Sequence, residues 1–284
     1  MNLDPRTSRG GVRLAAAALA SGAVLATAAC SGVAGGIDAT TAPTTNTPGT
    51  TSSPTAADPS PAVTSLPQGA EKLELDPADF TTEITNPYWP MAPGDTWRYE
   101  ETDSEGGRQQ VVIRVTSKTK LLANGITARV VRDEVRENGE LTEATDDWYA
   151  QDTAGNIWYL GEDTAEYDHG KVVTREGSFE AGVDGAQGGI AMPAQPRPGM
   201  SYRQEYYRGH AEDRATVVTV GEEHVEVPFG YFTKDVLMTR DLVPLEPRVQ
   251  ELKFYAPGVG PVLSVHLDGT GGRATLVKYI RGTG

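Results

Sequence analysis

The sequence predicts an all-β protein whose folded part is a single curved antiparallel sheet or an open, barrel-like meander. Runs rich in valine and threonine show partial alternation of apolar and polar residues, which is typical of strands with one buried face. Short turn signals separate these runs at intervals typical of antiparallel β proteins. The expected strands cover residues 109–117, 126–136, 214–220, 234–240, 249–255, 261–267 and 274–280.

Glycine-containing turns mark where consecutive strands reverse direction. Asn124-Gly125, Asn138-Gly139 and Asp168-His169-Gly170 are of this kind. The only helical element expected in the folded part is a short turn over 76–80, with Asp76 as its cap and Pro77 at its first position. The glycine- and proline-rich segment 181–200 breaks the strand pattern and predicts a long loop, either a functional lid or an inert cover.

The first 29 residues have the layout of a lipoprotein signal peptide. Arginines at positions 6, 9 and 13 precede an apolar, alanine-rich run over 14–29, which is too short and too weakly apolar to span a membrane. Cys30, the lone cysteine, follows directly and is the expected lipidation site. Ordinary cleavage after Ala26-Thr27-Ala28, giving a secreted protein, is the alternative.

Residues 30–69 and 70–284 differ sharply in composition. The first segment is rich in Thr, Ser, Pro, Ala and Gly and predicts a disordered tether. The second predicts one β-rich globular domain. The formal net charge of -14 belongs to that domain, because the three arginines and three aspartates before residue 70 cancel. Such a charge argues against nucleic-acid binding.

Several motifs resemble those of a largely uncharacterised family of exported lipoproteins from high-GC Gram-positive bacteria. These are the opening segment 86–99 (NPYWPMAPGDTWRY), DWYAQD at 147–152, YRQEYY at 202–207 and YAPGVG at 255–260. The resemblance implies a curved antiparallel sheet and an envelope location, but no activity. In the opening segment, Trp89 and Trp97 are the expected core anchors.

Aromatic residues form clusters along the chain, and two interpretations stay open: they line a ligand-binding cleft, or they fill the core. The candidate binding residues are Trp148, Tyr149, Trp158, Tyr202 and Tyr206.

Adjacent acidic residues recur along the chain, as in Asp146-Asp147, Glu162-Asp163 and Glu212-Asp213. Neighbours on a strand point to opposite faces, so an acid/base pair would need carboxylates from separate strands. The candidates for such a hydrolase are Asp147, Glu205, Glu212 and Asp213.

No recognised motif predicts a catalytic, cofactor or metal site. Glu222, His224 and Glu226 share one strand face, but the pattern favours a solvated face over a metal site. The same reading applies to Ser264, His266 and Asp268. Nucleophile-elbow, phosphate-loop and zinc-helix motifs are absent.

Taken together, these features predict a cell-envelope lipoprotein, held at the extracellular face of the membrane by lipid on Cys30. Its expected function is that of a non-catalytic binding module for an apolar or glycan ligand. A carboxylate-based envelope hydrolase and a structural subunit of an envelope complex are the alternatives.

Overall fold

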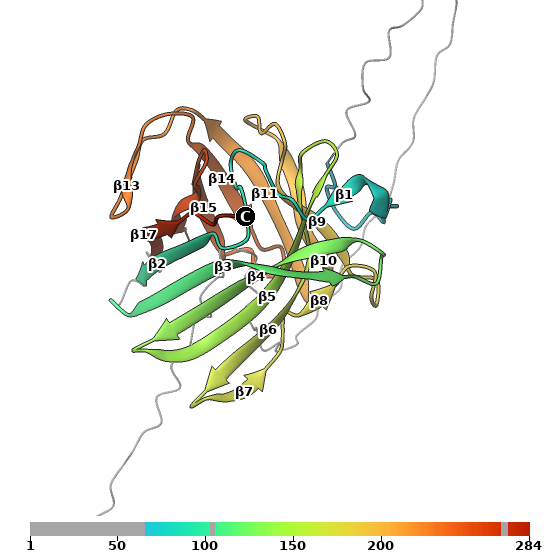
Figure 1. The fold of residues 1–284 in the computed structure, drawn as a ribbon, viewed down its shortest axis with the longest axis horizontal. Helices are drawn as coiled ribbons and strands as arrows, with labels where there is room; N and C mark the ends of the chain where they lie inside the picture. The colour runs from blue at the N-terminus through green and yellow to red at the C-terminus, as the bar shows by residue number, and fades with distance from the viewer. Residues whose placement is uncertain (1–65, 103–105, 268–271) are drawn as a thin grey trace, which may run out of the picture. The chain divides into compact units, whose positions relative to one another are not determined.

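The computed structural model describes residues 66–102, 106–267 and 272–284, and its dominant feature is one large antiparallel sheet (Figure 1). The predicted Cys30 anchor, signal peptide and most of the tether lie outside the described residues. The strands in the first half are β1 (Phe80–Thr81), β2 (Thr96–Thr102), β3 (Arg108–Leu121), β4 (Thr127–Glu137), β5 (Glu140–Asp152), β6 (Ile157–Asp168), β7 (Lys171–Thr174) and β8 (Phe179–Glu180). Those in the second half are β9 (Gln187–Met192), β10 (Ser201–Tyr207), β11 (Ala211–Val220), β12 (Val225–Val227), β13 (Gly230–Phe232), β14 (Leu237–Leu242), β15 (Gln250–Ala256), β16 (Gly260–His266) and β17 (Arg273–Ile280).

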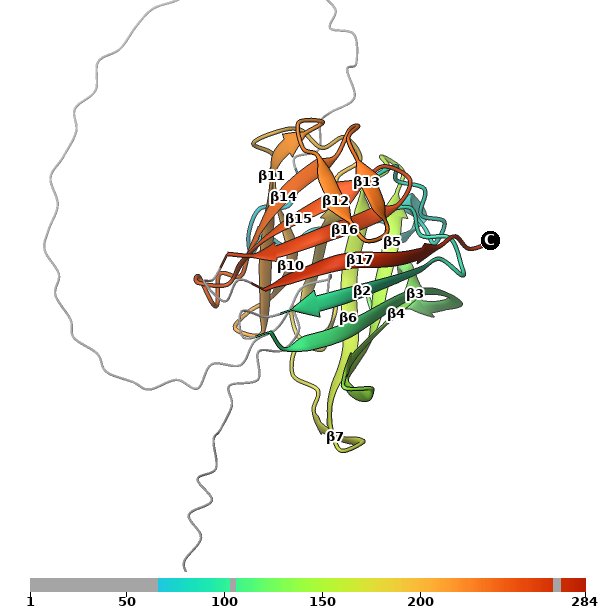
Figure 2. The same ribbon diagram turned by 90° about the vertical axis from the view of Figure 1, so that its left-hand side faces the viewer.

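The sheet closes into a twelve-stranded ring. Its order runs β5-β4-β3-β2-β17-β16-β15-β14-β11-β10-β9-β6, and pairing of β6 with β5 completes it. Figure 2 shows the ring from the side, with the β6–β7 hairpin projecting beyond it. The prediction of an all-β antiparallel fold is therefore confirmed. The sequence predicted a curved sheet or an open barrel, and the structure shows that the sheet closes on itself.

Every strand expected from the valine and threonine runs is present. The glycines of the expected turns, such as Gly125, Gly139 and Gly170, have positive φ angles. Asn138 and Gly139 adopt positive φ angles of 51° and 87°, as a tight hairpin turn between β4 and β5 requires. The short helical turn is also confirmed at Pro77–Asp79, with the Asp76 side chain accepting a hydrogen bond from the backbone nitrogen of Ala78 at 2.9 Å.

The expectation of a long loop over 181–200 is wrong. This segment contains β9, which lies between β6 and β10 in the ring. Two glycines explain why it lacks a strand-like composition. A Cβ on Gly188 would lie 2.5 Å from the Tyr159 carbonyl oxygen, and one on Gly189 would lie 2.3 Å from the Arg203 carbonyl oxygen. Only glycine permits this close approach of neighbouring backbones.

Aromatic residues pack in the interior of the ring. Trp89, on the segment before β2, packs against Tyr149 of β5 and Tyr255 of β15, with ring centroids 5.6 and 6.0 Å away. These two strands lie on opposite sides of the ring, so Trp89 bridges its interior. Trp89 and Trp97 are both buried, which confirms them as core anchors.

Two further segments, which are not among the twelve strands of the ring, pack against it. Residues 67–71 contact β10 through Arg203, whose backbone nitrogen donates to the Pro67 carbonyl at 2.6 Å and whose side chain donates to the carbonyls of Gly69 and Glu71. The β12–β13 hairpin packs against β16 and β17, and the Phe229 backbone nitrogen donates to the Leu276 carbonyl.

Candidate functional site: a layer of buried carboxylates

Five carboxylates on the inner face of the ring form what we call the acid layer. Its members come from β4, β5, β6, β10 and β11, and each residue is only 2–5% exposed: Asp133, Asp147, Glu162, Glu205 and Asp213. Such residues are almost never buried to this degree without a partner. The acid layer is therefore the chemically most unusual part of the described structure.

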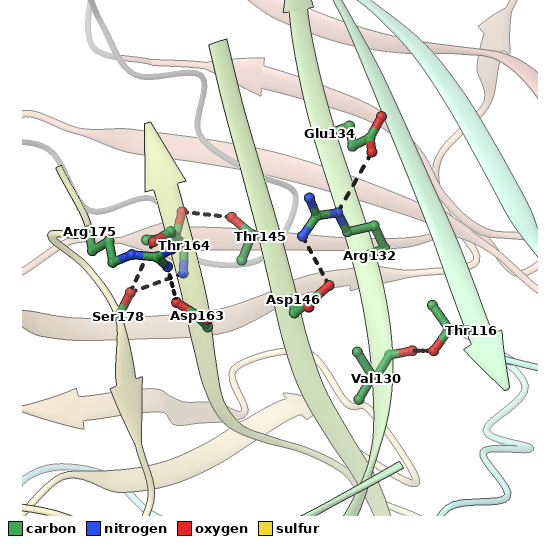
Figure 3. Close-up of polar contacts among 10 residues, drawn as sticks. All are labelled: Thr116, Val130, Arg132, Glu134, Thr145, Asp146, Asp163, Thr164, Arg175 and Ser178. Carbon is green, nitrogen blue, oxygen red and sulfur yellow. Dashed lines mark hydrogen bonds and ion pairs between the residues drawn. The ribbon is translucent and has the colours of Figure 1, made fainter. Parts of the chain in front are cut away.

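Strand alternation separates each acidic doublet into an inner and an outer member. Asp133, Asp147, Glu162 and Asp213 are the inner members, and Glu134, Asp146, Asp163 and Glu212 are their outer neighbours. Figure 3 shows three outer members with their arginines. Arg132 lies 3.1 Å from Asp146 and 3.7 Å from Glu134, and Arg175 lies 2.5 Å from Asp163.

The inner members are held by register across neighbouring strands. Asp147 of β5 is the cross-strand partner of Glu162 of β6, and Thr145 is the partner of Thr164. The two threonine hydroxyls are 2.7 Å apart and join the same two strands (Figure 3). On the far side of β9, Glu205 is the partner of Asp213.

Tyr159 connects two members of the acid layer. Its hydroxyl oxygen lies 2.9 Å from Asp147 Oδ1 and 2.9 Å from Glu162 Oε2. A hydroxyl donates only one hydrogen, so it can donate to one carboxylate and accept from the other only if that acid is protonated. The geometry thus calls for a proton shared within the Asp147–Tyr159–Glu162 group.

Burial favours the protonated form of these acids. It raises the pKa of Asp147 to about 7, against a smaller lowering by the Tyr159 hydrogen bond. Burial, with Asp147 as the next cause, also raises the pKa of Glu162 and Asp133 well above their usual values. Burial and Asp213 do the same for the pKa of Glu205, while Lys253 lowers it slightly.

Two acid-layer oxygens have no hydrogen-bond donor in the described structure. These are Asp133 Oδ1 and Glu205 Oε2, on residues that are 2% and 3% exposed. A buried polar atom without a partner costs about 1–3 kcal/mol, and more when it is charged. Both atoms are therefore positions where an added donor would be stabilising.

The neighbouring part of the inner face is charge-compensated. The Lys253 ammonium lies 3.0 Å from Asp241 Oδ2 and 3.2 Å from Glu251 Oε2. Burial alone would lower the pKa of Lys253, but these two carboxylates outweigh it and hold the pKa well above its usual value. The Ser264 hydroxyl donates to Glu251, and His266 Nε2 lies 3.8 Å from the same carboxylate.

The structure separates the five aromatic residues predicted to bind a ligand. Tyr149 and Tyr202 are buried on the inner face, where acid-layer or Lys253-bound carboxylates raise their pKa values further after burial itself. Trp148 and Trp158 are buried on the outer face, under Lys120 and Phe80 respectively. Tyr206 alternates with inner-facing Glu205 and bonds to Arg208, so it lies away from the acid layer. Ligand binding by these five stays a prediction.

Three of the four hydrolase candidates do come together. Asp147, Glu205 and Asp213 belong to the acid layer, whereas Glu212 faces the other way and accepts a hydrogen bond from the Gly209 backbone nitrogen at 2.9 Å. Sequence reasoning missed Asp133 and Tyr159. For Asp133 a signal existed, since it occupies an inward position between Val131 and Val135.

The other polar patterns contribute less. Glu222, His224 and Glu226 are exposed, as a solvated face requires. Ser264 and His266 instead lie in the Lys253 region of the inner face, and Asp268 lies outside the described residues. Across residues 66–102, 106–267 and 272–284, no group of three or more His, Cys, Asp or Glu side chains is arranged to hold a metal ion.

Comparisons with known proteins assign no function to this site. No family model matches the chain, and no curated protein matches it. Among solved structures, the chain is similar to one described as "a putative lipoprotein from Parabacteroides distasonis ATCC 8503", at 12% identity and a TM-score of 0.38, covering 68% of this chain and 98% of that one. A likeness of this degree carries no argument about function. In the described part of the chain, no helix has the length and apolar character needed to cross a membrane.

Proposed function

We propose that this protein is an exported lipoprotein, anchored through Cys30, whose closed sheet binds a small molecule on its inner face without transforming it. The observation that carries the proposal is the acid layer, with two buried carboxylate oxygens that lack a donor. Proteins rarely leave such atoms unsatisfied unless they serve a ligand or a reaction.

Binding is favoured over catalysis by how the carboxylates are held. Each sits on a strand of the closed ring and is at least nine-tenths buried. Rigid strands suit a preformed binding surface. The convergence of Asp147, Glu205 and Asp213 is the one observation that favours a hydrolase, with Asp147, whose pKa is about 7, as its general acid.

The test is native mass spectrometry of the processed protein purified from its own host. A bound small molecule should be present in the wild type and in Glu212→Gln, and lost in Glu205→Gln without loss of the β-sheet circular dichroism signal. Protein with no mass beyond that of the processed, lipidated chain, in both wild type and control, would contradict binding. Turnover of an envelope substrate that Asp147→Asn abolishes would replace binding by the hydrolase, and a stoichiometric protein partner would favour a structural subunit.

Anchoring is tested separately. Cys30→Ala should leave the chain unprocessed or release it into the medium, because the proposed acyl chains attach to that sulfur. A processed Cys30→Ala protein that still fractionates with membranes would contradict the lipid anchor.

A further inference from the structure

The inner face has two groups of buried carboxylates, and they differ in their partners. Asp241 and Glu251 share the Lys253 ammonium at 3.0 and 3.2 Å. In the acid layer, the charged group that most affects the pKa of Asp133 and of Glu162 is another carboxylate, Asp147. Lys253 also lowers the pKa of Glu205, yet Asp133 and Glu205 each retain an oxygen without a donor.

We propose that the acid layer binds an organic polycation, a linear diamine or polyamine whose ammonium groups take the place that Lys253 holds in the other group of carboxylates. This inference rests on the proposed binding function and names the chemical class of its ligand.

An ammonium group matches what Asp133 Oδ1 and Glu205 Oε2 lack. It brings three N–H donors and no acceptor, so one group can serve Asp133 Oδ1 or Glu205 Oε2 and a neighbouring carboxylate together. Opposite charges attract strongly where water is excluded, provided that hydrogen bonds satisfy both partners. Lys253, which contacts two carboxylates, shows that this inner face accommodates such an arrangement.

The distribution of the acids favours several linked charges over one. The members lie on β4, β5 and β6, which are consecutive in the ring, and on β10 and β11 beyond β9. Neighbouring strands are about 4.8 Å apart, so the carboxylates are spread over several strands of the ring. The described residues offer no three-ligand metal group, which agrees with this reading.

The strand between β6 and β10, which carry Glu162 and Glu205, contributes two glycines to the ring. Gly188 of β9 is the cross-strand partner of Glu205, and Gly189 is the partner of Tyr159. Tyr149 and Tyr202, on the same inner face, offer aromatic surface to the ammonium groups and the methylenes between them.

The test is isothermal titration calorimetry on the processed full-length protein, from which any bound small molecule has been removed by dialysis. The probes are spermidine, 1,4-diaminobutane, 1-aminobutane, 1,4-butanediol and magnesium chloride. The diamine should bind at least tenfold more tightly than the monoamine, and spermidine more tightly still. The diol and magnesium should show no binding. This series uses the wild type alone and does not depend on any variant folding.

Variants then locate the site. Glu205→Gln and Asp133→Asn should each weaken spermidine binding at least tenfold, while the outer-face controls Glu212→Gln and Glu134→Gln should leave it unchanged. Equal loss in inner and outer variants would mean nonspecific attraction to an acidic protein and would overturn the proposal.

The outcomes also separate the two levels of inference. If no amine binds but protein from its host carries another molecule that Glu205→Gln loses, the polycation is wrong and the binding function stands. If no amine binds and no molecule copurifies, both are wrong. Magnesium binding that excludes spermidine would replace the polycation by a metal ion.

Discussion

The inner and outer members of the acidic doublets are chemically alike, adjacent in sequence and opposite in their surroundings. Asp146 and Asp163 meet arginines at the surface, whereas Asp147 and Glu162 share a tyrosine hydroxyl inside the ring. Exposed ion pairs contribute little to stability because water already solvates both charges. Buried carboxylates must be protonated, hydrogen-bonded or paired. One residue of sequence thus separates a solubilising charge from a candidate binding group.

The largest expected effect comes from disturbing the strand that brings Glu205 close to Tyr159. Gly189→Ala should lower the free energy of unfolding by ~3 kcal/mol or more, because the new Cβ would meet the carbonyl oxygens of Arg203 and Gln204 at 2.3 and 2.5 Å. Urea denaturation measures the change. Gly230→Ala on β13, whose Cβ would have only contacts of 3.6 Å or more, is the control and should stay near the wild type.

The next effect is a loss of stability as pH rises. Asp147 has a folded-state pKa of about 7 against an ordinary value of 3.8, so the folded chain binds more protons between these values. Stability is therefore fully present below about pH 4 for this group and falls as the pH rises through 7. The melting temperature without ligand should drop by roughly 5 °C or more from pH 5 to pH 8.

Asp147→Asn should reduce this pH dependence, because the amide cannot ionise, whereas Asp146→Asn should preserve it. A melting temperature that rises from pH 5 to pH 8 would contradict the burial of uncompensated acids.

A smaller effect is expected from the hydroxyl that joins the two inner carboxylates. Tyr159→Phe should cost about 1–2 kcal/mol, because the variant leaves Asp147 and Glu162 without their shared partner. It should also shift the pH transition upward, since the Tyr159 hydrogen bond lowers the pKa of Asp147. Thermal melts across the pH range measure both changes. Tyr231→Phe, at an exposed position, is the control, and equal costs would remove any special role for Tyr159.

The smallest effect belongs to the outer face. Arg132→Gln should change stability by less than ~1 kcal/mol, because its contacts with Asp146 and Glu134 are about one-third exposed. A double-mutant cycle with Asp146→Asn measures the coupling directly. A coupling as large as the cost of Tyr159→Phe would erase the contrast between the two faces.

The strands with apolar inner residues could be predicted from sequence, and the candidate site could not. In β3, every second residue from Val111 to Val115 is apolar and buried, and this alternation predicts a strand. In β5 and β6 the inward positions hold Asp147, Glu162 and two threonines, so the usual signal is weakened where the site lies. The pairing of β5 with β6 also depends on the whole ring. The acidic doublets were visible in sequence, but which member faces inward depends on strand register.

The pairing of β17 with β2 has a consequence for how the chain folds. Residues 96–102 hydrogen-bond to residues 273–280, so the first long strand of the ring completes its pairing only when the last strand is present. Trp89 likewise packs between Tyr149 of β5 and Tyr255 of β15, which are far apart in the chain. Contacts this distant in sequence make folding slow and leave strand edges open in the meantime. The eight residues of β17 therefore act as the latch of the domain, and a chain ending before Arg273 would keep two open edges at the place where the ring should meet.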